Sequence, residues 1–130
     1  MTKERVATVT AAIGAGLLFG TAGFHLSAYP SVVAQTPTDA RPLMSALWVA
    51  GGASLIISAL LAVAATPLFV VRRRALLGIA ALTPISIAAV QIAYLGFLPP
   101  TALLLVDAAV LVVAGELGRA HQSRAVPQSL

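Results

Sequence analysis

Apolar residues fall into four long blocks, and short polar stretches separate them. The helices that we predict from these blocks span residues 6–28, 43–70, 75–97 and 100–117. Each block is close to or above the roughly 20 residues that an α-helix needs to cross a bilayer. The block 43–70 exceeds that length, so we expect it to tilt or to end early at Pro67. The pattern predicts an all-α fold, an integral membrane bundle of four transmembrane helices in one domain, residues 1–117.

The polar stretches carry residues that end helices or turn the chain. Tyr29-Pro30 is expected to end the first helix, and residues 31–42 are predicted to form a polar loop. Thr83-Pro84 lies near the middle of the third helix and should kink it, because proline lacks a backbone donor. Leu98-Pro99-Pro100 leaves room only for a very short turn. The third and fourth helices should therefore be antiparallel neighbours.

The composition narrows the class of protein. Hydrophobic residues make up 59% of the chain and charged residues only 9%, whereas soluble domains carry about 25% charged residues. The absence of cysteine excludes disulfides, thiolate metal sites and a cysteine nucleophile. HExxH, P-loop and nucleophile-elbow motifs are also absent from the sequence. We therefore predict no metal site, no cofactor and no nucleic-acid partner.

The basic residues predict the orientation of the helices. If four spans are present, one side holds Lys3, Arg5, Arg72, Arg73, Arg74, Arg119 and Arg124, and only Arg41 falls on the other. The positive-inside rule then predicts cytoplasmic N- and C-termini (N-in, C-in), in a plasma membrane of the bacterial inner-membrane type. Residues 118–130 are polar and are predicted to form a disordered cytoplasmic tail. Anchoring is the favoured interpretation of the three consecutive arginines, with a lipid-phosphate site as the alternative.

Small residues recur at helical spacing in the first two blocks. Gly16-Leu-Leu-Phe-Gly20 is a GxxxG sequence, and Ala12 extends its four-residue period. Such stripes let membrane helices approach closely. We favour the interpretation that this stripe packs within the bundle. The alternative is that Gly16 and Gly20 contact a second copy of the chain or another membrane protein. The second block has its own small stripe around Gly51 and Ser58.

One acidic residue stands inside an apolar block. A carboxylate at membrane depth is costly unless it faces a partner or a wet cavity, so Asp107 is a candidate functional residue by default. A structural role is the alternative, with the carboxyl hydrogen-bonded to Gln91 or Tyr94. At 1.5 Å of helix rise per residue, His25, Gln91 and Asp107 all lie roughly 5 to 11 Å below the outer boundary. Trp48 begins the second helix at a similar depth.

This layer of polar side chains is the main functional signal in the sequence. The candidate catalytic residues are Asp107 and His25, and the candidate ligand-binding residues are Gln91, Tyr94, Trp48 and Thr21. Thr21 enters the set because it lies four residues before His25, on the same helix face. Each has a plainer interpretation: histidine, tyrosine and tryptophan gather at membrane interfaces, and glutamine often joins helices.

The layer of polar side chains suggests two possible functions. The leading hypothesis is a membrane protein that binds a lipophilic small molecule or lipid in a polar pocket of the outer leaflet. An acid–base enzyme, such as an isomerase, is its catalytic version, and the sequence leaves open whether the protein is an enzyme. The alternative is a non-catalytic accessory or assembly subunit, in which Asp107 pairs with a basic residue of a larger membrane complex.

Overall fold

The computed structural model describes residues 3–66 and 70–122, which form five helices. They are α1 (Lys3–Ser27), α2 (Tyr29–Gln35), α3 (Arg41–Ala65), α4 (Val70–Leu95) and α5 (Pro99–Gln122). Four segments, α1 with α2, α3, α4 and α5, are long and apolar enough to cross a membrane. The described residues contain no strand. The predicted all-α bundle with four helices of membrane-spanning length is confirmed, and an integral membrane protein fits it.

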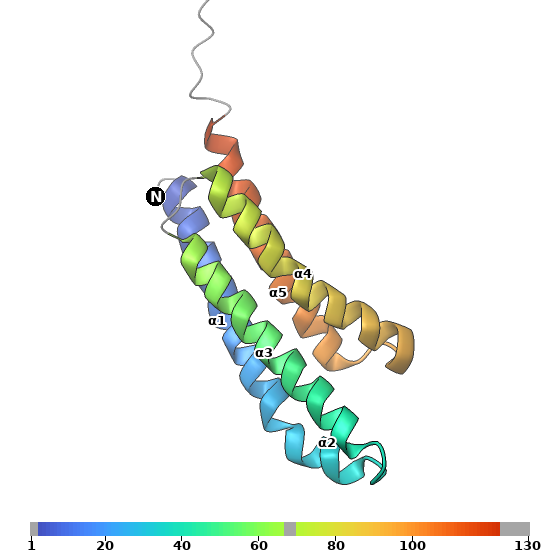
Figure 1. Ribbon diagram of the computed structural model, residues 1–130. Coiled ribbons are helices and arrows are strands. Elements are labelled where there is room, and N and C mark those ends of the chain that lie inside the picture. Colours follow the sequence, from blue (N-terminus) through green and yellow to red (C-terminus); the bar gives the residue numbers. More distant parts are fainter. Residues whose placement is uncertain (1–2, 67–69, 123–130) are drawn as a thin grey trace, which may run out of the picture.

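The helices form two hairpins that lie side by side, α1–α2–α3 and α4–α5 (Figure 1). α1 packs against α3 and α5, and α4 packs against α3 and α5. The hairpins are close at the end that holds Lys3 and Val70, which we call the closed end. They diverge toward the opposite end, which holds α2 and the turn after α4 and which we call the open end (Figure 1). In the same view α2 projects beyond the α4–α5 turn.

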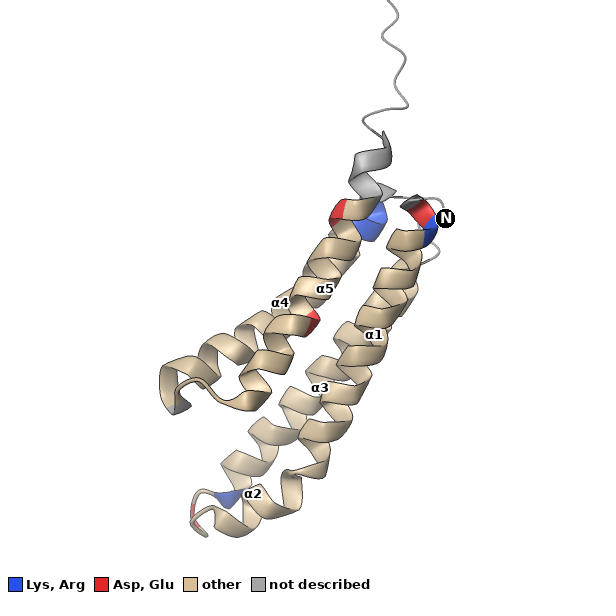
Figure 2. Cartoon of the chain, turned by 180° about the vertical axis from the view of Figure 1, so that it is seen from behind, with Lys and Arg blue, Asp and Glu red and all other residues tan. Residues whose placement is uncertain are grey.

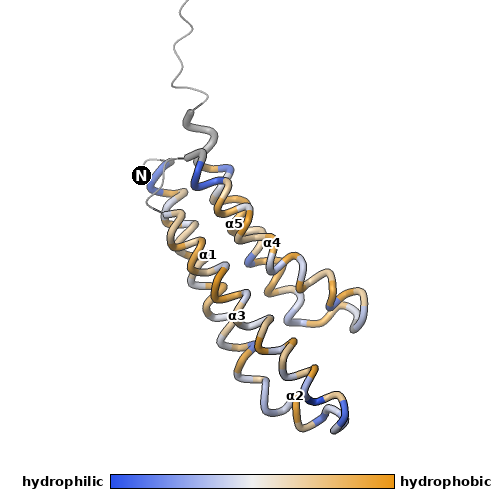
Figure 3. Tube along the Cα trace, viewed as in Figure 1, coloured by the Kyte–Doolittle hydropathy of each residue, from blue (hydrophilic) through white to orange (hydrophobic). Residues whose placement is uncertain are grey.

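Most charged residues lie at the two ends of the bundle, as insertion into a membrane requires. Figure 2 shows basic and acidic residues at the closed end, a basic and an acidic residue at the tip of the open end, and one acidic residue between the two ends. Hydropathy follows the same division, with the orange apolar stretch between two bluer ends (Figure 3). At the closed end Arg74 pairs with Glu116 at 2.8 Å, and the buried Arg73 donates to the Thr66 carbonyl at 3.0 Å. Which end faces the cytoplasm stays a prediction.

Alanine, and not the GxxxG sequence, forms the close-packed face of α1. Ala7, Ala11 and Ala15 repeat every fourth residue and are buried in the bundle. α1 approaches α5 closely at Gly14, where an added Cβ would lie 2.8 Å from Leu111 Cδ2. At Gly16 and Gly20 an added Cβ would meet nothing within 4 Å, and both residues are exposed. The interpretation of Gly16 and Gly20 as a seam within the bundle was therefore wrong.

The segment predicted as a loop at residues 31–42 is partly helical. α1 ends at Ser27, and α2 begins at Tyr29 with Pro30 in its first turn. Proline is tolerated there because the first helical N–H groups have no intrahelical acceptor. Pro30 thus starts a helix instead of ending one. The loop that remains covers residues 36–40, and α3 starts at Arg41.

The helix boundaries around the other polar stretches also follow from local chemistry. The three arginines at 72–74 lie within α4 and not in a connecting loop, since arginine is a good helix former. α3 ends at Ala65, and Pro67 falls outside the described residues. The predicted short turn before α5 is present, with Gly96 at φ +79°, a conformation that favours glycine.

Pro84 lies inside α4 and is buried. Because proline lacks an N–H group, the carbonyl of Ala80 loses its normal donor one turn later. Figure 1 shows α4 curving near its middle, in the yellow part of the helix that contains this residue. The curve carries the second half of α4 away from α3, toward the open end.

Candidate functional site

A cleft separates the two hairpins at the open end. It consists of two adjoining cavities of about 230 Å³ and about 330 Å³. Both cavities are lined by His25, Trp48, Ile87 and Gln91. We call the two together the interhairpin cleft. Its walls come from α1 and α3 on one side and α4 and α5 on the other, so it exists because the hairpins diverge.

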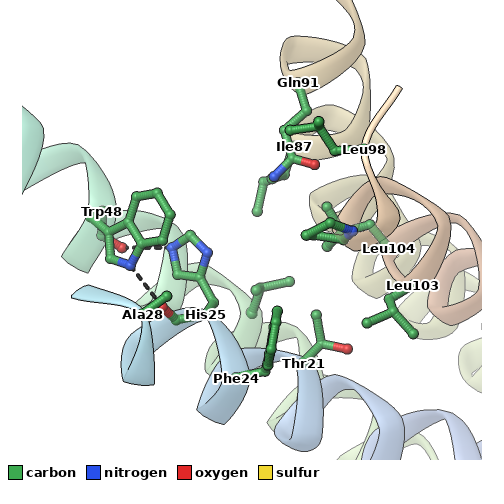
Figure 4. Close-up of a pocket in the computed structure, with 12 residues that line it drawn as sticks. Thr21, Phe24, His25, Ala28, Trp48, Ile87, Gln91, Leu98, Leu103 and Leu104 are labelled. Carbon is green, nitrogen blue, oxygen red and sulfur yellow. Dashed lines mark hydrogen bonds between the residues drawn. The ribbon is translucent and has the colours of Figure 1, made fainter. Parts of the chain in front are cut away.

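His25 and Trp48 lock α1 to α3 at the edge of the cleft. Their rings stack with centroids 4.2 Å apart and planes 7° from parallel. His25 Nε2–H donates to the Trp48 carbonyl at 3.0 Å, and Trp48 Nε1–H donates to the His25 carbonyl at 2.7 Å. Gly51 makes room for this pair, since an added Cβ would lie 3.2 Å from His25 Nε2. The second ring nitrogen of His25, Nδ1, points into the cleft (Figure 4).

Gln91 is fixed from the opposite hairpin by a chain of hydrogen bonds. The Leu98 N–H donates to Thr101 Oγ1 at 3.3 Å, and Thr101 Oγ1–H donates to Gln91 Oε1 at 2.8 Å. Thr101 is fully buried at the start of α5. Its bond to Leu98 resembles half of a capping box, in which the third helical residue accepts from the capping N–H. The amide nitrogen of Gln91 is left facing the cleft (Figure 4).

Asp107 faces the interior of the bundle and not lipid. Its side chain is 2% exposed on α5, at the contact with α1. Thr21 is the side chain that interacts with its carboxyl, and Oδ2 has no hydrogen-bond partner among the described residues. Asp107 does not line the cleft, whereas Thr21 does. In Figure 4 the Thr21 hydroxyl points toward α5, so Thr21 stands between the cleft and the acid.

The structure therefore brings together most of the side chains that the sequence singled out. Thr21, His25, Trp48 and Gln91 line one cleft, with Asp107 behind Thr21. Tyr94 is 82% exposed and lines neither cavity. The suggested bonds from Asp107 to Gln91 or Tyr94 are not formed, because Gln91 accepts from Thr101 and Tyr94 points away. Among the described residues, Thr21 is the one side chain that interacts with the Asp107 carboxyl.

Sequence reasoning passed over Thr101. The available signal was its position, three residues after Leu98 at the start of a helix, where a hydroxyl commonly caps the backbone. Its second bond, to Gln91, depends on the α4–α5 turn and has no sequence signature. Thr101 is what decides which end of the Gln91 amide faces the cleft.

Among the described residues, no three His, Asp or Glu side chains lie close enough together to hold a metal ion. Comparison with family models, with curated proteins and with solved structures gave no match to this chain. The geometry of the cleft therefore carries the functional proposal. An apolar cavity with a few fixed polar groups is the usual form of a small-molecule site.

Proposed function

We propose that this chain is an integral plasma-membrane protein that binds a lipophilic small molecule or lipid in the interhairpin cleft. The observation that carries the proposal is the composition of the cleft walls. Apolar side chains such as Phe24, Leu55 and Leu104 surround a few polar ones. Two of these, His25 and Gln91, are held in place from behind by hydrogen bonds. Fixed polar groups in an apolar site orient a ligand.

The proposed ligand enters from the outer leaflet. The basic residues Arg72, Arg73 and Arg74 lie at the closed end, and the positive-inside rule assigns that end to the cytoplasm. The open end, with the cleft, then lies toward the outer leaflet. Both termini are cytoplasmic in this orientation.

The catalytic version of the proposal uses Asp107 as the acid or base. A buried carboxyl with an unpaired oxygen is the type of group that exchanges a proton with a bound molecule. Since Thr21 separates Asp107 from the cleft, its hydroxyl would relay the proton. In an isomerase-like reaction His25 Nδ1 would take a proton from one ligand atom while Asp107, through the Thr21 hydroxyl, delivers one to another. Transfer of the proton from His25 back to Asp107 would then restore both groups.

Binding is tested by filling the cleft. Ala28 lines the smaller cavity, so Ala28→Leu reduces its volume. Ala89→Leu is the matched control, because Ala89 is exposed on the outside of α4. The chain has a single tryptophan, Trp48, in the cleft wall, so its fluorescence in nanodiscs reports binding of dodecane, dodecanol and dodecyl phosphate.

We expect at least one of these probes to change Trp48 emission in a saturable way. Ala28→Leu should raise the concentration at half-saturation or abolish the change, and Ala89→Leu should leave it as in the wild type. A linear, unsaturable response to every probe, or equal responses in both variants, would contradict the proposal.

A partner subunit is the second candidate function, and the exposed glycines favour it. Gly16 and Gly20 are exposed on α1, and nothing lies within 4 Å of a Cβ added at either. Such small exposed residues let a second helix approach closely. The occupant would be a second copy or another membrane protein. The earlier form of this hypothesis, in which Asp107 meets a partner's basic residue, does not fit a side chain that is 2% exposed. Gly16→Leu should disrupt association in a cross-linking assay and leave the fold intact.

A further inference from the structure

Two polar groups face the interhairpin cleft from opposite walls, His25 Nδ1 from α1 and the Gln91 amide nitrogen from α4 (Figure 4). Neither has a hydrogen-bond partner among the described residues. Their chemical roles are set by the bonds made behind them, so the kind of ligand group that fits between them can be worked out.

The first group is an acceptor. A backbone carbonyl only accepts hydrogen bonds, so the bond between His25 Nε2 and the Trp48 carbonyl places a proton on Nε2. In a neutral imidazole the other nitrogen then carries a lone pair and no proton. His25 Nδ1 therefore offers the cleft one hydrogen-bond acceptor.

The second group is a donor. Thr101 Oγ1 accepts from the Leu98 N–H and directs its own proton to Gln91. The atom that receives this proton has to be the amide oxygen, because the amide nitrogen has no free lone pair. The nitrogen of Gln91, with its two protons, is thereby turned to the cleft.

The absence of charged side chains from the cleft lining also limits the kind of ligand that fits. Among the described residues that line the cleft, none is Lys, Arg, Asp or Glu. A phosphate, carboxylate or ammonium head group would lose its hydration there without gaining an opposite charge. The site therefore selects against charged amphiphiles.

We infer that the ligand of the interhairpin cleft is a neutral lipophilic alcohol, with its hydroxyl held between His25 and Gln91. A hydroxyl is one donor and an acceptor in a single group: it donates to His25 Nδ1 and accepts from the Gln91 amide. The hydrocarbon part lies along Phe24, Leu55, Leu103 and Leu104. This inference rests on the proposed function and names its ligand class.

The experiment compares four probes with one chain length, dodecanol, its methyl ether, dodecane and dodecyl phosphate. Trp48 emission is followed in nanodiscs, and each half-saturation point is corrected for partition into protein-free nanodiscs. The ether keeps the acceptor and loses the donor, so it should bind roughly three- to tenfold more weakly than the alcohol. Dodecane should bind more weakly again, and dodecyl phosphate weakest.

Two variants assign each half of the hydroxyl to its residue. His25→Phe should abolish the preference for dodecanol over the ether, because the bond that only the alcohol donates is lost. The bond from His25 to the Trp48 carbonyl is lost for both probes alike, so the ratio of their half-saturation points is the readout. Gln91→Leu should weaken both. Gln35→Leu, the same change on the exposed α2, should alter neither. Should Gln91→Leu fail to fold, Gln91→Glu keeps an acceptor for Thr101 and removes the amide donor.

The result separates this inference from the proposed function. Saturable binding of all four probes with equal strength, or preference for the phosphate, would overturn the alcohol and leave the binding site standing. Saturable binding of none would end the proposed function itself. The wild-type probe series decides between these outcomes even where a variant is too unstable to purify.

Discussion

His25 and Trp48 hold each other by a stack 4.2 Å between ring centroids and by one hydrogen bond in each direction. Each side chain bonds the backbone carbonyl of the other residue, so neither can rotate without breaking a contact made by both. The pair joins α1 to α3 within one hairpin at the open end, where the two hairpins have diverged (Figure 1). It keeps one wall of the interhairpin cleft in place.

Gly51→Ala tests this pair. The added methyl would lie 3.2 Å from His25 Nε2, and the imidazole cannot retreat because it is stacked and bonded. We expect a shifted Trp48 emission maximum and a loss of stability of about 1 kcal/mol, as for mild overpacking. Gly78→Ala is the control, since nothing lies within 4 Å of its added Cβ. Unchanged emission in Gly51→Ala would show that the rings are not held as described.

Gly14→Ala and Gly16→Ala should behave in opposite ways. At Gly14 the new methyl would lie 2.8 Å from Cδ2 of the fully buried Leu111. Either Leu111 must shift within the packed core or α1 and α5 must separate, at a cost of about 1–3 kcal/mol. At Gly16 the methyl meets nothing, and alanine is the better helix former. Thermal unfolding in detergent should show a lower melting temperature for the first variant only. Equal effects would mean that the α1–α5 contact is looser than in the structure.

Asp107 contributes little stability in this arrangement. Its Oδ2 has no partner among the described residues, and only Thr21 interacts with the carboxyl. Replacing a buried acid by an apolar side chain of similar size removes a burial cost. We therefore expect Asp107→Leu and Asp107→Asn to melt at or above the wild-type temperature.

If Asp107 exchanges a proton with a ligand in the cleft, these two variants should differ from the wild type in activity. Turnover of a bound ligand should be lost in both, because neither side chain can exchange a proton. A marked drop in the melting temperature of Asp107→Leu, with unchanged ligand handling, would instead assign Asp107 a structural role.

Orientation is open to direct measurement because the sequence has no cysteine. Glu4→Cys and Ser31→Cys place single thiols at exposed positions near the closed and open ends. With the closed end in the cytoplasm, an impermeant thiol reagent added to intact cells should label Ser31→Cys only. Labelling of Glu4→Cys alone would invert the topology, and the cleft would then belong to the inner leaflet.

The helices were predictable from the sequence because membrane depth imposes a strong rule. Every backbone polar group must be satisfied within the span, so long apolar blocks leave few choices. The depth of His25, Gln91 and Asp107 followed from the same counting. What each side chain faces did not, because the direction around a helix depends on which neighbour it packs against.

The sequence pattern did not identify which face of a helix packs against its neighbours. Ala7, Ala11 and Ala15 have the same four-residue spacing as Gly16 and Gly20, yet only the alanine face is buried. Spacing alone does not choose between two such faces. Tyr94 and Gln91 were both predicted to bind the ligand, and the contact with Thr101 distinguishes Gln91 as the residue that turns inward.

The apolar helices of the two hairpins differ in length, and this difference determines how the protein fits bilayers of different thickness. The apolar part of α3 is 25 residues long and that of α5 is 19, or roughly 37 Å and 28 Å at 1.5 Å per residue. A hydrocarbon core of about 30 Å matches the shorter helix and is exceeded by the longer. Lipids beside α5 then need little adjustment, while those beside α3 must stretch or α3 must tilt. A thicker bilayer therefore suits α3 and a thinner one suits α5, so a change of bilayer thickness should alter the tilt of one hairpin relative to the other.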